Sequence, residues 1–147
     1  MRKINTTRFG EIEVDEKTIV TFDHGIPAFE DERDFAIVPY DAESPYLFLQ
    51  SASTPELAFL MTDPFIFFPD YTFELDDANM EALGVTKDDD VLVCSLITIP
   101  PTGIKNMTTN LLAPIVINKS NMKARQVVLE KTNYTTKHRL FQDKKEE

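Results

Sequence analysis

Few residues of this 147-residue chain carry side chains suited to catalysis, and they stand far apart. The histidines, His24 and His138, lie near opposite ends, and the single cysteine is Cys94. The four glycines form no phosphate-binding loop, and neither paired cysteines nor spaced histidines are present to bind zinc. Carboxylates paired across a sheet are the one remaining way to build an acid–base site. We expect no enzyme, no cofactor and no metal site.

Cys94 and a run of three aspartates have plainer interpretations. Cys94 lies inside an apolar stretch, where a thiol packs as a small hydrophobic side chain, and it has no second cysteine for an internal disulfide. The aspartates at residues 88–90 follow Thr86, which could cap a helical turn whose amino end favours acids. They lack the alternating ligands and the glycine of a calcium loop. We expect a buried cysteine and solvated acids.

The charges are unevenly divided along the chain. Residues 1–100 hold six Lys or Arg and twenty-one Asp or Glu, a net charge of −15, whereas residues 101–147 hold nine and four, a net charge of +5. The two parts sum to −10. An acidic surface repels nucleic-acid phosphates and attracts a basic protein, mainly by raising the encounter rate. We expect no direct binding to nucleic acid, and the acids serve either a basic partner or solubility alone.

Two apolar stretches joined by a polar loop indicate the centre of the fold. In residues 91–99 both alternating sets of side chains are mostly apolar, which predicts a strand covered on both faces. Residues 111–117 show the same pattern, and their β-branched side chains favour a strand over a helix. Pro114 cannot donate to a ladder, so we expect it at a strand start, a bulge or an edge.

Shorter patterns predict the remaining elements. Residues 9–22 resemble a β-hairpin that turns near Glu16 and Lys17 and points Ile12 and Val14 inward. Apolar or alternating runs predict further strands at residues 35–38, 46–49, 57–61 and 122–129. One short helix is expected between an amino-terminal cap at Asp76 or Asp77 and a carboxyl-terminal cap at Gly84. The chain is therefore predicted to be all-β in class, mainly strands with one short helix.

The length of the chain fits a single domain, residues 1–147, whose polar end from about 132 to 147 we expect to fray. The opening sequence MRKINTTRFGEIEV lacks the apolar core of a secretory signal peptide. No apolar run is long enough to cross a bilayer. We expect a cytoplasmic protein that has no membrane partner.

Two segments are candidates for a partner-binding surface. Residues 64–75, if extended, place Phe65, Phe67, Tyr71, Phe73 and Leu75 on a core-facing side and Ile66 and Phe68 on the other. Residues 100–110 form a loop that two prolines restrict and that carries apolar residues among polar ones. We expect a partly exposed apolar patch rimmed by acids, made of Asp63, Ile66, Phe68, Asp70, Pro100, Pro101, Ile104, Met107 and Asn110. Alternatively, Pro64 and Pro69 bend the chain and bury the first apolar pair, and the loop only closes one end of the fold.

Three long stretches together closely resemble the FliW family of flagellar assembly factors. They read FGEIEVDEKTIVTFDHGIPAFEDERDFAIVP, PYLFLQSASTPELAFLMTDPFIFFPDYTFEL and VLVCSLITIPPTGIKNMTTNLLAPIVINKSNMKARQVVL, and they cover nearly the whole chain. Within them, GIPAF at residues 25–29 and NLLAPIV at residues 110–116 look like family signatures. The resemblance implies a small antiparallel β-barrel-like fold and a non-enzymatic role.

The same resemblance implies two protein partners. One is flagellin, and the other is the carbon storage regulator CsrA, a translational repressor of flagellin messenger RNA. Plentiful flagellin would occupy the protein and leave CsrA free to repress, and export of flagellin would release the protein to sequester CsrA. The antagonism is either allosteric, as the family suggests, or a direct repulsion of RNA by acids. The alternative role is a dedicated flagellin export chaperone that contacts no translational regulator.

Overall fold

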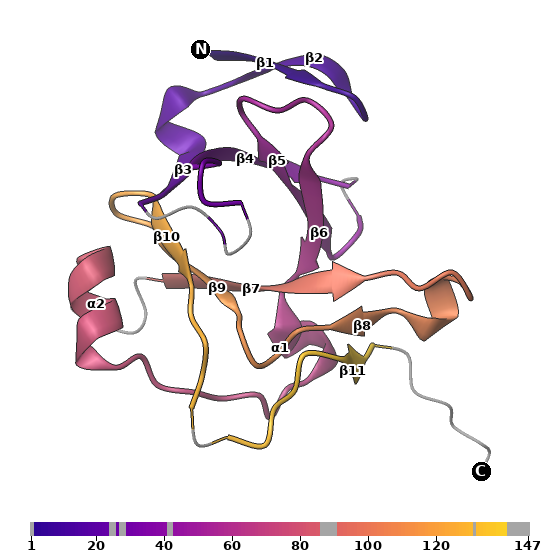
Figure 1. Ribbon diagram of the computed structural model, residues 1–147, viewed down its shortest axis with the longest axis vertical. Helices are drawn as coiled ribbons and strands as arrows, with labels where there is room; N and C mark the ends of the chain where they lie inside the picture. The colour runs from indigo at the N-terminus through magenta and orange to yellow at the C-terminus, as the bar shows by residue number, and fades with distance from the viewer. Residues whose placement is uncertain are drawn as a thin grey trace.

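A closed ring of seven β-strands forms the body of the protein in the computed structural model (Figure 1), which describes residues 2–23, 26, 29–40, 43–85, 91–130 and 132–140. Around the ring the strands are β3 (Ile19–Phe22), β4 (Asp34–Pro39), β5 (Tyr46–Ser51), β6 (Ala58–Thr62), β7 (Val91–Thr98), β9 (Ile115–Asn118) and β10 (Lys123–Gln126). Neighbouring pairs are antiparallel except β3 and β10, which are parallel. The expected barrel-like all-β fold is confirmed, with this one parallel pair added.

The two apolar stretches form the centre of the barrel. β7 pairs with β6, with β9 and with the short strand β8 (Thr108–Thr109), so it is a central strand. Cys94 joins one core cluster and Val91 packs against the other, which confirms that both of its faces are covered. Every residue of β9 is buried. Ile115 and Ile117 join one core cluster and Val116 joins another, as expected for a strand with two apolar faces. Pro114 directly precedes β9, which confirms its place at a strand start.

Two core clusters lie on the two sides of these central strands. The first gathers Phe22, Phe35, Leu49, Met61 and Cys94 with the two isoleucines of β9. The second packs Leu83 of α2 against Tyr71, Leu111, Val127 and Leu129. The predicted burial of Cys94 is confirmed, because its side chain has no exposed surface.

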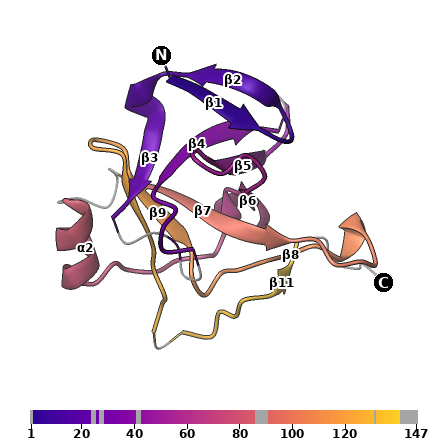
Figure 2. The same ribbon diagram turned by 45° about the horizontal axis from the view of Figure 1, so that its top comes forward.

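The first hairpin lies outside the barrel and is not the one predicted. β1 (Arg2–Thr6) pairs with β2 (Gly10–Val14), and the chain turns at residues 7–9, where Gly10 has φ of 70°. A positive φ suits glycine, and the Thr6 hydroxyl fixes the turn by accepting a hydrogen bond from the Phe9 N–H. Residues 16–18, the predicted turn, form the 3₁₀ helix η1 (Glu16–Thr18), after which the chain enters the barrel as β3. Figure 2 shows this hairpin beside β4 and β5.

Two short α-helices are present among the described residues. α2 (Asp77–Leu83) is the predicted helix: the Asp76 carboxylate accepts from the Asn79 N–H at 2.8 Å, and Gly84 ends the helix with φ of 72°. α1 (Pro64–Phe67) bends the start of the aromatic segment, as the alternative based on Pro64 and Pro69 predicts, although Ile66 is exposed and not buried. Pro64 occupies the first turn, where its missing N–H costs nothing, and the Asp63 carboxylate accepts from the Phe65 N–H.

The carboxyl-terminal part of the described chain returns to the barrel. The 3₁₀ helix η3 (Ile104–Asn106) lies between β7 and β8, and β11 (His138–Arg139) pairs with β8. The Tyr134 ring packs on Tyr71 with centroids 4.7 Å apart. Strand pairing and aromatic contacts place residues 132–140 against the barrel, and the fraying expected of the tail stays a prediction.

Some sequence predictions lie outside the described residues. These are the placements of His24, of the aspartates at residues 88–90 with Thr86, of most of the GIPAF stretch and of residues 141–147. Within the part of the chain that the structure describes, no helix is both long enough and apolar enough to span a bilayer.

Candidate partner-binding site

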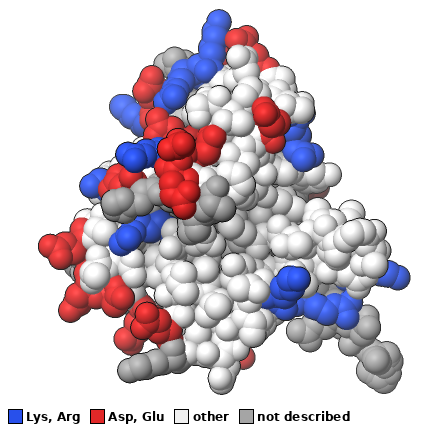
Figure 3. All heavy atoms as spheres, viewed as in Figure 1, with Lys and Arg blue, Asp and Glu red and all other residues white. Residues whose placement is uncertain are grey.

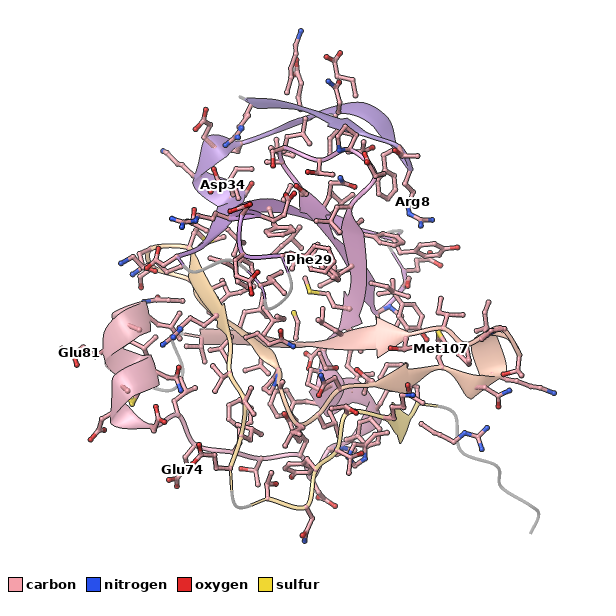
Figure 4. All side chains as sticks on the ribbon, in the orientation of Figure 1. Arg8, Phe29, Asp34, Glu74, Glu81 and Met107 are labelled. Atoms are coloured by element: carbon pink, nitrogen blue, oxygen red, sulfur yellow. The ribbon has the colours of Figure 1, made fainter. Side chains whose placement is uncertain are left out.

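An apolar groove of about 380 Å³ lies between the amino-terminal hairpin and the loop that follows β7. Figure 4 labels Arg8 and Met107, which mark its opposite sides. The groove is lined by Arg8, Tyr40, Tyr46, Phe48, Ala58, Leu60, Ile99, Ile104 and Met107. Clefts of this size with mostly apolar walls are typical binding sites for ligands or for the side chains of a partner.

Strand periodicity sets the floor of the groove. Tyr46 and Phe48 stand two residues apart on β5, so their side chains share a face, and Leu60 of β6 lies opposite Phe48 in the ladder. The Arg8 guanidinium covers the Phe48 ring at 4.6 Å from its centroid. Partial burial raises the pKa of Tyr46, so its hydroxyl stays neutral and can donate a hydrogen bond to a ligand.

The opposite wall is the loop that the sequence singled out. The Pro100 carbonyl accepts from the Gly103 N–H at 3.0 Å, and this turn leads into η3. Ile104 on η3 is 64% exposed, as expected, whereas Met107 is 3% exposed. The expectation that Met107 is partly exposed is wrong, because strand pairing after η3 draws it inward and its carbonyl accepts from the Leu140 N–H. Pro101 is exposed and Pro100 is half-buried.

The remaining predicted residues do not join this groove. Phe68 and Asp70 line a second hollow of about 280 Å³, together with Tyr134 and His138. Ile66 is exposed on α1, and Asp63 caps that helix. The predicted single patch with an acidic rim is therefore wrong in its geometry, because helix formation at residues 64–67 turns these side chains away from one extended face. The charged residue of the groove is Arg8.

Asn110 has a local structural task. Its side-chain oxygen accepts from the N–H groups of Leu112 and Ala113 at 3.0 and 2.9 Å, which shapes the approach to β9. A role for Asn110 or the other eight candidate residues in binding a partner stays a prediction.

The second hollow contains the only histidine in the described part of the chain. His138 accepts from the Thr135 N–H through Nε2 at 2.9 Å, and its ring meets Phe68 edge-on with centroids 5.8 Å apart. Burial lowers the pKa of His138, which keeps the imidazole in the neutral form that this hydrogen bond needs.

Most acidic side chains visible in Figure 3 lie away from the groove. Figure 3 shows Asp and Glu concentrated on the left of the molecule, over α2 and the segment before it, where Glu74, Asp76, Asp77 and Glu81 are exposed. The right-hand side of the same view is largely uncharged, with a few acidic and basic side chains at its margins. The protein thus presents an acidic surface and an apolar groove in different places.

The described residues offer little for catalysis. No three of their His, Cys, Asp or Glu side chains are grouped to hold a metal ion. The pKa of the Cys94 thiol is raised to about 12, chiefly by burial and also by the negative charge of Asp63, so Cys94 is not a thiolate nucleophile.

Comparison with known proteins shows the family of the chain. The family model described as "FliW protein" matches residues 3–140. The chain belongs to the FliW family. A flagellar assembly factor FliW from Geobacillus sp. (strain WCH70) is 44% identical over 142 residues, covering 97% of each chain. The FliW of Bacillus subtilis (strain 168) is 43% identical over 135 residues, 92% of this chain and 94% of the relative.

The FliW fold is equally well matched. A crystal structure of the flagellar assembly factor FliW superposes with a TM-score of 0.88 and 43% identity, covering 97% of this chain and 99% of the other. This likeness and the family match confirm the resemblance seen in the sequence.

Sequence reasoning did not identify the groove residues Arg8, Tyr40, Tyr46 and Phe48 of this FliW chain. Tyr46 and Phe48 alternate on a strand that was predicted, so their shared face was available as a signal. Arg8 and Tyr40 gave no such signal, because Arg8 lies in a hairpin turn that was predicted elsewhere and Tyr40 lies just beyond a predicted strand.

Proposed function

We propose that this protein regulates flagellin production in the cytoplasm by binding two proteins in turn, flagellin and a CsrA-type translational regulator. It performs no chemical reaction of its own. Bound flagellin occupies it while flagellin is plentiful. Once flagellin is exported, the free protein sequesters the regulator and flagellin synthesis resumes.

The observation that carries the proposal is the apolar groove with Ile104 at its rim, in a chain whose relatives are flagellar assembly factors. Solvent-exposed Ile99 and Ile104 stand beside buried Met107, so a partner that enters can cover apolar surface without unfolding anything. The prolines before η3 limit the freedom of the loop, which lowers the entropy lost when a partner fixes it.

The acidic surface supports the regulator as the second partner. An RNA-binding regulator presents basic surface to phosphates, and the acids over α2 offer a competing surface of the same sign as RNA. The net charge of −10 makes direct binding of nucleic acid by this chain unfavourable.

The test substitutes one exposed residue of the groove. Ile104→Glu places a charge among apolar walls and should weaken binding of flagellin, of the regulator or of both by about tenfold, about 1.4 kcal/mol, with the melting temperature unchanged. Titration with each purified partner beside a thermal melt measures both effects.

The matched comparison is Ile66→Glu, which makes the same change at an exposed isoleucine on α1. We expect it to leave binding intact. Loss of binding in Ile66→Glu alone would move the site to α1, and normal binding of both partners by Ile104→Glu would refute the groove. Wild-type protein that binds flagellin but no regulator would identify a dedicated export chaperone instead.

A further inference from the structure

The chain beyond β10 continues as an extended edge that is paired on one side. Residues 127–130 run alongside residues 112–114: the Val127 N–H donates to the Pro114 carbonyl at 2.9 Å and the Leu129 N–H donates to the Leu112 carbonyl at 2.8 Å. Alternate backbone groups of an extended strand point to opposite sides. The N–H groups of Val128 and Glu130 therefore point away from that neighbour, and within the described residues they donate to no acceptor.

The edge borders a cavity that is distinct from both the apolar groove and the second hollow. Figures 1 and 2 both place the extended edge between β9 on one side and α2 on the other. A cavity of about 360 Å³ lies there, with residues 127–130 and Thr132 on one wall and residues 72–74 and Asp76 on the other. At this cavity the side chains of Val128 and Glu130 are exposed, so the edge is open to solvent there.

Both walls of this cavity carry acids. Glu74 and Asp76 lie on one wall and Glu130 on the other, and all three side chains are exposed. Figure 4 shows Glu74 on this side, below α2. Between these acids, Val128 is 63% exposed. Charged side chains on a free edge discourage pairing with another copy of the same chain. Here the charges beside the open backbone groups and Val128 are acids, which favours a basic strand.

We propose that the edge at residues 127–130 binds an extended, basic segment of a partner protein by β-strand addition. The main chain of the segment pairs with the free N–H and carbonyl groups at Val128 and Glu130. Its Lys or Arg side chains meet Glu74, Asp76 and Glu130, and an apolar side chain covers Val128. Backbone pairing supplies affinity in this mode, and the alternating side chains supply specificity.

Charge selects this occupant over a second copy of the same chain. Two copies joined edge to edge would bring Glu130 and its neighbouring acids together, and each copy carries a net charge of −10. The site is separate from the apolar groove, and the inference rests on neither flagellin nor the regulator.

The test uses a fluorescent, end-blocked peptide of about seven residues in which Val and Lys alternate, long enough to span the edge. Anisotropy titration should show saturable binding at least about tenfold tighter than that of the matching Val–Glu peptide. A third peptide, N-methylated at alternate residues, keeps the charges but loses the donors of one edge. It should bind at least about tenfold more weakly than the unmodified peptide.

Two protein variants locate the contact. Val128→Pro removes the free N–H, a change that edge strands tolerate. It should weaken binding of the Val–Lys peptide at least about fivefold, about 1 kcal/mol. Val128→Ala keeps the N–H and should bind within about twofold of wild type. Thermal melts establish that both fold. If Val128→Pro is unstable, Glu130→Lys replaces it as the test variant and should bind the Val–Lys peptide more weakly than wild type.

Three outcomes would overturn the proposal. Equal binding of the N-methylated peptide would mean simple charge attraction, and full binding by Val128→Pro or Glu130→Lys would place the peptide elsewhere. A wild-type dimer in sedimentation that Val128→Pro dissociates would make the occupant a second copy. Absence of saturable binding up to about 1 mM peptide would leave the edge without this activity.

Discussion

Cys94 lies in β7 with its thiol inside the barrel, among Phe22, Met61 and Ile115. A thiol tolerates this setting because it is a weak hydrogen-bond donor and packs as a small hydrophobic group. A hydroxyl in the same place would need a partner, because a buried polar group without one is costly.

We therefore expect Cys94→Ser to lower the free energy of unfolding by about 1–3 kcal/mol and to leave partner binding unchanged. Cys94→Ala is the control, since it removes the sulfur and adds no polar atom. Denaturant titration compares the two. A Ser variant at least as stable as the Ala variant would mean that the hydroxyl finds a partner, and lost binding with unchanged stability would contradict the core position of Cys94.

Single residues were predictable where a local rule decides them. Asp76 and Gly84 bound α2 as expected, because capping depends on nearby backbone groups alone. Met107 was not predictable in the same way. Its burial depends on the pairing of β8 with β7 and β11, which involves residues far along the chain.

Ile104 at the start of η3 and Met107 directly after η3 are apolar, three residues apart and in opposite environments. Ile104 faces solvent at the rim of the groove, and Met107 is enclosed at its base. A loop that serves only to cover the barrel would bury both residues. A loop that serves only as a contact surface would expose both.

We expect Met107→Ala to lower the free energy of unfolding by about 2–5 kcal/mol, because it leaves a cavity. Ile104→Ala should change it by less than about 0.5 kcal/mol, as is usual for exposed positions. Chemical denaturation of the two variants, side by side with wild type, gives the comparison. Equal losses in both would indicate that η3 packs as a unit.

Strands with a long run of regular hydrophobic periodicity were predicted well. Elements whose pairing depends on the position of a turn were predicted less well. β7 and β9 followed from their apolar faces, whereas the first hairpin was assigned to the wrong pair of strands. Residues 16–18 offered polar turn signals, but the actual turn uses Gly10 and the Thr6 hydroxyl. The segment at α1 was left open between an extended and a bent chain, because its aromatic pattern did not show that Asp63 and Pro64 start a helix.

On the scale of the whole molecule, the acidic excess acts over distance. Exposed acids over α2 create a negative field in front of one surface, and such a field raises the rate at which a basic partner arrives. Salt screens this field: the Debye length falls from about 30 Å at about 0.01 M to about 8 Å at about 0.15 M.

We therefore expect the association rate with a CsrA-type regulator to fall as salt is raised, while the dissociation rate changes much less. Stopped-flow mixing at several salt concentrations measures both rates, and a thermal melt at each concentration checks the fold. An association rate that is the same at low and high salt would contradict steering by the acids.

The parallel pair of β3 and β10 determines how late in synthesis the barrel can close. Thr21 pairs with Lys123, so the barrel stays open on the ribosome until nearly all of the strands have been synthesised. At about 5–20 residues per second, the nascent chain spends on the order of seconds with the edge of β3 unpaired after β6 has emerged. Contacts between such distant residues also make folding intrinsically slow. The β1–β2 hairpin is the first part to emerge, and in the folded protein it packs on apolar side chains of β3 and β4.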